Sequence, residues 1–286
     1  APANGRDLRS PWPMDAAYLE QLLIWRRQEE DDLHRRDSWL ALAGLHWLAE
    51  GRQTAGAAVS ADVRLPPSFP HRLGDFEVRR SQVFFYPAQP FLLEGLPPEG
   101  EPLRPDTAQN PTFLRVGDLT LVVIERGRRR GVRVWDNGRL KTAAQERSWY
   151  APDSDWVIEA SFEPAGSGAT IPVPSVTGDV SDEPLLGTAH FRFGDASASL
   201  RAVPTDEGRL WFLFADSTNG TTTYPSGRFL VAEIPMNGRA VLDFNRAYNP
   251  PCAFTAFATC PLPPPGNRLP FPIEAGERYQ HAPGAE

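Results

Sequence analysis

Apolar residues recur at helical spacing near the start of the chain. Tyr18, Leu22 and Trp25 follow one another at intervals of four and three residues, which places their side chains on one face of a helix. Asp15 stands just before this stripe and belongs to the residue types that cap helix N-termini. We therefore predict a helix from Asp15 to about Arg36 that lies across a sheet.

Further along, apolar and polar residues alternate in short runs, as in half-buried β-strands. Turn-forming residues such as Pro66-Pro67 and Gly117-Asp118 separate the runs. Short strands at this spacing are typical of an antiparallel sandwich or barrel. The predicted strands are residues 59–65, 76–80, 83–86, 91–94, 112–116, 119–125 and 132–135.

A second β-rich region begins near residue 156. The run Leu210-Trp211-Phe212-Leu213-Phe214 is apolar at every position, which predicts a central strand that is buried on both faces. After Asn249 the chain is rich in proline, which predicts a capping loop. We expect an antiparallel β-barrel or half-barrel here, with strands at 156–162, 188–193, 199–203, 210–215, 228–236 and 239–245.

These patterns together predict a mainly β protein. The 30 prolines and 23 glycines support many turns between short elements. The predicted divisions are an N-terminal arm and helix at 1–37, a β-sandwich at 38–145, and a β-rich domain at 146–286.

Charge and hydropathy exclude two classes of partner. The 29 basic and 36 acidic residues give a net charge of −7 without a basic block, so we expect no nucleic-acid partner. The apolar run at 119–124 is too short to cross a bilayer, so we expect no membrane partner. No motif indicates a cofactor, and none is expected.

The chain has two cysteines, Cys252 and Cys260, which are too few for a disulfide scaffold or, alone, a zinc site. We therefore expect no metal. Three interpretations stay open: two buried thiols, a disulfide that closes the loop, or a catalytic nucleophile at Cys252 activated by Arg228 or Arg268. The low cysteine content favours the cytoplasm, and a signal peptide removed ahead of Ala1 would instead mean export.

The dipeptide Asn237-Gly238 predicts a two-residue hairpin turn. Strands that pair along their length from this turn would place Ala232 opposite Asp243. Alternation then places Arg228, Asp243 and Asn245 on one face, which is apolar near the turn and polar at the far end.

Such a face suits the mouth of a pocket for a small polar or anionic ligand. Arg228 would supply charge, Asp243, Asn245 and Tyr248 would orient the ligand, and Arg268 would reach in from the loop. The alternative is a buried hydrogen-bond network that fixes the long loop. Two further acidic residues, Glu274 and Glu277, stand three apart, but Gly276 and the nearby prolines predict a loop or strand end rather than a helical acid pair.

The polar C-terminal segments form a distinctive series that resembles the bacterial and archaeal family called domain of unknown function 1684. Trp25-Arg26 and the pattern from Trp39 to Trp47 fit the start of the same family. The resemblance supports the boundaries and the C-terminal cluster and implies no particular reaction. The segments that carry it are 214–220, 223–224, 227–230, 243–245, 247–255, 260–264, 267–269 and 273–277.

A second resemblance lies in the N-terminal half. Gly51, Gly56 and the run at 62–66 are similar to the opening strands of forkhead-associated sandwiches. Ala57 stands where that family has its phosphate-binding arginine, so the resemblance implies the fold without phosphothreonine binding.

Our leading hypothesis is a protein that binds a small polar or anionic ligand beside the C-terminal hairpin. The alternative is a hydrolase or acyltransferase that uses Cys252 in that pocket. The third hypothesis is an interaction module that acts through the N-terminal sandwich.

Overall fold

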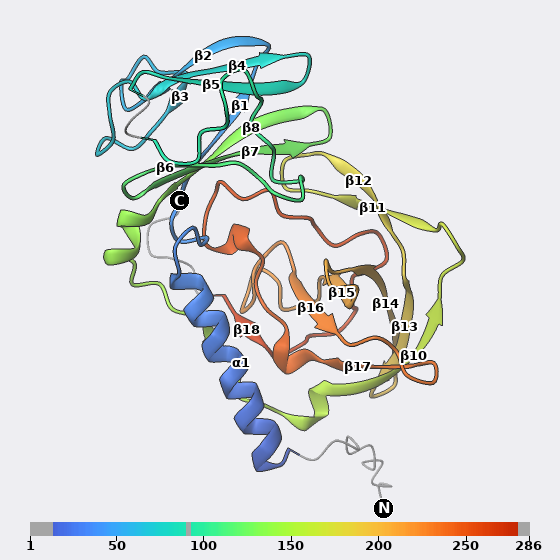
Figure 1. The fold of residues 1–286 in the computed structure, drawn as a ribbon. Helices are drawn as coiled ribbons and strands as arrows, with labels where there is room; N and C mark the ends of the chain where they lie inside the picture. The colour runs from blue at the N-terminus through green and yellow to red at the C-terminus, as the bar shows by residue number, and fades with distance from the viewer. Residues whose placement is uncertain (1–13, 90–92, 280–286) are drawn as a thin grey trace, which may run out of the picture. The chain divides into compact units, whose positions relative to one another are not determined.

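The computed structural model describes residues 14–89 and 93–279, which divide into two units (Figure 1). Of the described residues, 14–30, 146–253 and 259–279 belong to the half-barrel unit. The sandwich unit takes in residues 31–145 and 254–258. Residues 90–92, which include part of the strand predicted at 91–94, lie outside the described residues.

The sandwich unit consists of two four-stranded sheets with a shared core. All of the neighbouring strands are antiparallel except β2 and β3, which are parallel. Buried residues from both sheets, such as Phe76 and Leu121, belong to one apolar cluster, so the predicted antiparallel sandwich is confirmed. In sheet order the strands are β1 (Leu42–Leu48), β8 (Arg129–Asp136), β7 (Leu119–Arg126) and β6 (Phe113–Val116), then β3 (Val63–Arg64), β2 (Gly51–Gly56), β4 (Gly74–Arg79) and β5 (Gln82–Pro87).

The half-barrel unit is built on a six-stranded sheet, so the predicted C-terminal half-barrel is also confirmed. Its apolar core includes Phe212, Phe214 and Phe244, all of which are fully buried. Leu269, Ile273 and Ala275 of the Pro-rich loop join this core, which shows that the loop packs against the sheet. The strand order is β16 (Arg228–Ala232), β15 (Leu210–Phe214), β14 (Ala196–Pro204), β13 (Gly187–Phe193), β10 (Val157–Pro164) and β17 (Arg239–Asp243).

Strand β15 has the central, two-sided position that its sequence predicts. It lies between β14 and β16, with Phe212 and Phe214 in the main core. Leu213 belongs to a second cluster on the other face, with Trp211 packed against that cluster. The hairpin of β11 (Thr170–Pro174) and β12 (Val180–Pro184), which is absent from the predicted strands, contributes Ile171 and Val173 to this second cluster.

The predicted pairing of the C-terminal hairpin is wrong beyond its turn. Met236 pairs with Arg239 as expected, and Asn237 and Gly238 have the positive φ values, 51° and 72°, that this turn type requires. However, β17 pairs with β10, with Asp243 opposite Val157. The turn determines only the residues next to it, and the curled sheet offers the edge of β10 as the partner for the returning strand.

Helix α1 (Ala16–His34) confirms the predicted helix and its cap. The backbone N–H of Tyr18 donates to Asp15 Oδ1 at 2.8 Å. Leu22 is fully buried, and Trp25 meets Trp149 edge to face at 5.4 Å between ring centroids. Across the described residues, every helix is too short or too polar to serve as a bilayer span.

Four short 3₁₀ helices and one small ladder complete the described elements. The ladder pairs β9 (Ser148–Trp149) with β18 (Glu277–Arg278). It joins the start of the half-barrel unit's main segment to the end of the Pro-rich loop. The 3₁₀ helices are η2 (Asn137–Lys141), η3 (Ser154–Trp156), η4 (Phe244–Arg246) and η5 (Pro251–Ala253).

Candidate functional site

A buried ion pair joins the first residue of β16 to the turn that follows β15. Arg228 Nη2 lies 3.0 Å from Asp216 Oδ2, and both side chains are 0% exposed. The guanidinium of Arg228 also donates to the carbonyls of Ile273, Ala275 and Glu277. Burial lowers the pKa of Arg228, while the nearby Asp216 acts in the opposite direction.

Asp216 is equally well bonded on its other oxygen. Its Oδ1 accepts hydrogen bonds from the backbone N–H and hydroxyl of Thr218 and from the backbone N–H of Ile273. Thr218 and Thr223 share a hydroxyl–hydroxyl bond of 2.7 Å, and Asn219 donates to Thr223. The pair therefore ties the 216–224 turn to the Pro-rich loop, as expected of a buried network that fixes this loop.

Asp243 and Asn245 belong to a second network, around Tyr18 of helix α1. The Tyr18 hydroxyl donates to Asp243 Oδ1 at 3.0 Å and accepts from Asn245 Nδ2 at 3.1 Å. Burial, followed by the charge of Asp243, raises the pKa of Tyr18. The sequence pattern marked Tyr18 as part of the apolar stripe and gave no signal for this polar contact.

The contacts of Tyr18 lead to a prediction about stability. Tyr18→Phe should lower the free energy of unfolding by about 1 kcal/mol, because the hydrogen bond to Asp243 is lost while the ring remains. Urea denaturation followed by tryptophan fluorescence measures the change. Tyr86→Phe, whose hydroxyl accepts an exposed bond from Arg79, is the matched control and should change little. Equal stability of the Tyr18 variant and the parent would contradict the prediction.

Asn245 also fixes the backbone of Asp153. Its Oδ1 accepts from the Asp153 N–H at 3.0 Å, and its Nδ2 donates to the Asp153 carbonyl at 2.9 Å. The side chain of Asp153 caps η3 by accepting from the Asp155 N–H. A residue proposed to orient a ligand thus positions the segment before η3.

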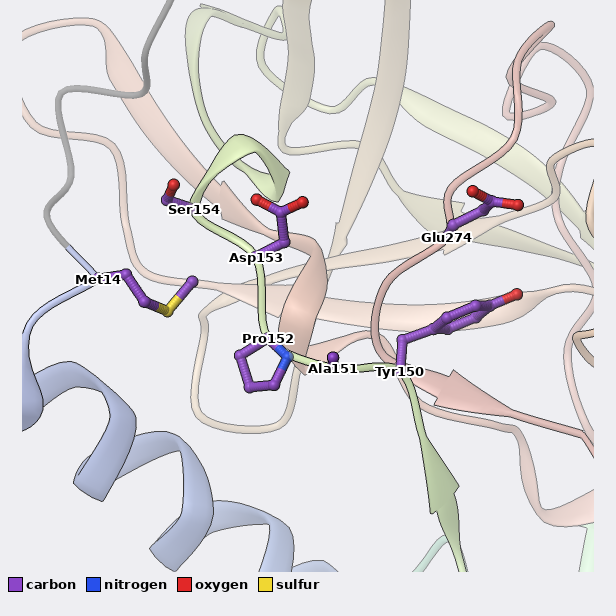
Figure 2. A pocket seen from close by; sticks show the side chains of 7 residues that line it. All are labelled: Met14, Tyr150, Ala151, Pro152, Asp153, Ser154 and Glu274. Atoms are coloured by element: carbon purple, nitrogen blue, oxygen red, sulfur yellow. The ribbon is translucent and has the colours of Figure 1, made fainter.

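That segment forms one wall of an open hollow in the half-barrel unit, about 510 Å³ in volume. Figure 2 shows Met14 at one end, Tyr150 and Glu274 at the other, and the Asp153 carboxylate between them. Neither Asp153 nor Glu274 forms an ion pair with another described residue. The residues that line the hollow are Met14, Tyr150, Ala151, Pro152, Asp153, Ser154 and Glu274.

Tyr150 is held firmly within this wall. Its hydroxyl bonds the Thr222 hydroxyl at 2.6 Å, and its backbone N–H donates to the Gly276 carbonyl at 2.9 Å. Arg26 donates to its carbonyl at 3.1 Å. These bonds make the wall a preformed surface, because they leave the Tyr150 ring little freedom to move.

Glu277 lies in β18 and not in a helix, as expected from the nearby Gly276 and prolines. It is buried, whereas Glu274 is exposed. The side chain of Glu277 is 1% exposed, and its Oε2 accepts from Arg147 Nη1 and from the Asn249 N–H, each at 2.7 Å. Burial raises the pKa of Glu277 to about 7, although Arg147 and the Asn249 N–H oppose this shift.

The other predicted site residues lie apart from these networks. Tyr248 is half-buried against Phe229, with the two rings edge to face at 5.7 Å, and its backbone pairs with Phe229. Arg268 is exposed and its backbone pairs with Ala215. Cys252 is half-buried, and its backbone N–H donates to Cys260 Sγ at 3.1 Å.

The structure thus brings Asp243 and Asn245 together around Tyr18, and places Arg228 in another network. Asp153 and Tyr150 were not predicted as site residues, because their irregular segment carries no periodic signal, and Glu274 was predicted only as a residue of a loop or strand end. Among the described residues, no group of three or more histidine, cysteine or acidic side chains has the arrangement of a metal site.

The fold and these networks define a mainly β protein with a half-barrel unit closed by a Pro-rich loop. Residues 145–278 match the family model described as Protein of unknown function (DUF1684), so the resemblance to domain of unknown function 1684 is confirmed over this segment. No curated protein matches the chain. One similar solved structure is the solution NMR structure of an uncharacterised protein of Haloarcula marismortui, which is 28% identical, with 48% of this chain and 78% of that chain covered and a TM-score of 0.41.

Proposed function

We propose that the half-barrel unit binds a small polar ligand in the hollow beside Tyr150. The observation that carries the proposal is the hollow itself: about 510 Å³ of open space with a fixed aromatic ring and two carboxylates on its walls. Its volume falls within the range of small-molecule pockets.

The charge of the walls favours a ligand with a protonated amine. Asp153 and Glu274 are acidic, and neither is neutralised by an ion pair with a described residue. An anionic ligand would need a cation directed at it, and the buried guanidinium of Arg228 is already bonded to Asp216 and three carbonyls. We therefore assign the selection of ligand charge to Asp153 and Glu274, and not to Arg228.

The test is calorimetric titration of the full chain with small amines, such as diamines and basic amino acids, and with carboxylates and phosphates of similar size. We expect binding of an amine, and Glu274→Gln and Asp153→Asn should each weaken it by about tenfold, the equivalent of one lost charge contact. Asn at position 153 retains the ability to cap η3, which keeps that variant folded.

Asp206→Asn, in the exposed turn before β15, is the control for a change of net charge and should leave binding unchanged. Binding of the anions, with no effect of the Glu274 and Asp153 substitutions, would refute the proposed site.

The surroundings of Cys252 do not favour the hydrolase or acyltransferase alternative. Among the described residues, the polar side-chain groups that contact Cys252 are the thiol of Cys260 and the phenol of Tyr224, whose hydroxyl donates to the Cys252 carbonyl at 3.0 Å. Acyl transfer by a cysteine relies on a general base such as an imidazole to accept the thiol proton. Two neighbouring thiols are instead suited to thiol–disulfide exchange.

A further inference from the structure

The two cysteines of the chain are in direct contact. The Cys252 N–H donates to Cys260 Sγ at 3.1 Å. Both are reduced in the structure. A sulfur 3.1 Å from the Cys252 nitrogen lies within reach of the Cys252 side chain, so a bond between the two sulfur atoms needs rotation of side chains, whereas widely separated cysteines need movement of the backbone.

The two thiols differ in their access to solvent. Cys260 is 3% exposed and its sulfur lies beneath the backbone of Cys252, while Cys252 is half-buried. A dissolved reagent therefore reaches Cys252 first, and Cys260 is placed to attack a sulfur that Cys252 has bonded. This is the arrangement of an attacking thiol and a resolving thiol.

Tyr224 completes the cluster. Its hydroxyl donates to the Cys252 carbonyl, and its ring meets Tyr279 edge to face at 5.0 Å. The Tyr224 carbonyl accepts from Asn219 Nδ2 at 3.0 Å, which links the phenol to the turn that Asp216 organises. The neighbouring Cys260 lowers the pKa of Cys252 and so favours the reactive thiolate, although burial opposes this shift.

We propose that Cys252 and Cys260 form a reversible dithiol–disulfide pair that exchanges with low-molecular-weight disulfides. This inference is independent of the ligand site proposed beside Tyr150.

The exchange proceeds in two balanced steps. The Cys252 thiolate attacks one sulfur of the small disulfide, forms a mixed disulfide, and expels one small thiolate. The Cys260 thiol loses its proton to solvent and attacks Cys252 Sγ, which releases the second small thiolate. The protein loses two electrons and the small disulfide gains them, and each released thiolate takes up one proton.

The experiment exposes the folded full chain to oxidised glutathione, quenches it with acid at intervals, and records the intact mass. We expect the mass to fall by that of two hydrogen atoms, and dithiothreitol to restore it. Iodoacetamide should then label both cysteines of the denatured reduced protein and neither cysteine of the denatured oxidised protein.

Variants separate the two roles. Cys260→Ala should stop after the first step, with one glutathione on Cys252. Cys252→Ala should react at least about tenfold more slowly than the parent, because its remaining thiol is buried. Circular dichroism checks that each variant folds, and Cys→Ser replaces Cys→Ala where folding fails.

Three results would overturn the proposal. They are two glutathione adducts on the parent chain, one adduct that persists without loss of the second small thiol, or thiols that react only after denaturation. The last result would identify Cys252 and Cys260 as inert core residues.

Discussion

Arg228→Met is expected to destabilise the half-barrel unit by about 3–5 kcal/mol, the usual result of removing one partner from a buried ion pair. The substitution leaves the charge of Asp216 buried without its cation. It also removes the donor that three carbonyls of the 273–277 segment share. Urea denaturation followed by tryptophan fluorescence measures the loss, with separate transitions fitted for the two units.

Two further variants test whether the loss of stability comes from the buried ion pair of Arg228 and Asp216. Arg209→Met removes a partly exposed arginine that pairs with the exposed Glu207, and it should change stability by less than about 1 kcal/mol. Asp216→Asn combined with Arg228→Met removes both charges and should recover part of the loss. A stable Arg228→Met protein would contradict the structural role and would return Arg228 to the ligand site that the sequence predicts.

Glu277→Gln is expected to remove a pH dependence of stability between about pH 4.5 and 7. In the folded chain the pKa of Glu277 is raised to about 7 by burial, while its ordinary value is 4.5. Within this window the folded state retains a proton that the unfolded state has released. The parent therefore loses stability as the pH rises through the window, by up to about 3 kcal/mol in total.

Glutamine resembles the protonated carboxyl and can still accept from Arg147 and the Asn249 N–H, so Glu277→Gln should become the more stable protein toward pH 7 and above. Glu29 adds to the increase in the pKa of Glu277 and Arg147 opposes it. Both residues must therefore be present in every variant that is compared. Glu274→Gln, in an exposed position three residues earlier, is the matched control. Stability curves of parent and Glu277→Gln that stay parallel from pH 4.5 to 8 would refute the prediction.

The parts of the fold that depend on neighbouring residues could be predicted from the sequence. The cap at Asp15, the apolar stripe through Leu22 and the two-sided strand β15 follow from local periodicity and residue type. The turn at 237–238 follows from the dipeptide alone.

The partners of distant segments could not be predicted in this way. The pairing of β17 with β10 depends on the curl of the whole sheet, which the turn residues do not encode. The burial of Arg228 depends on carbonyls that lie more than forty positions further along the chain. The helical spacing predicted only that the ring of Tyr18 lies on the apolar face of the helix. It did not predict the hydrogen bonds of the Tyr18 hydroxyl with Asp243 and Asn245.

The order of strands in the six-stranded sheet has a consequence for solubility. Its two outermost strands, β16 and β17, are consecutive in the chain and are joined through the turn at 237–238. An open sheet presents unpaired N–H and C=O groups along both edges, where another chain can add as a further strand. Here the short connection holds the two edges near one another, and Tyr248 pairs with Phe229 along β16. The half-barrel thereby limits the edge-to-edge aggregation to which a flat sheet of the same strands would be prone.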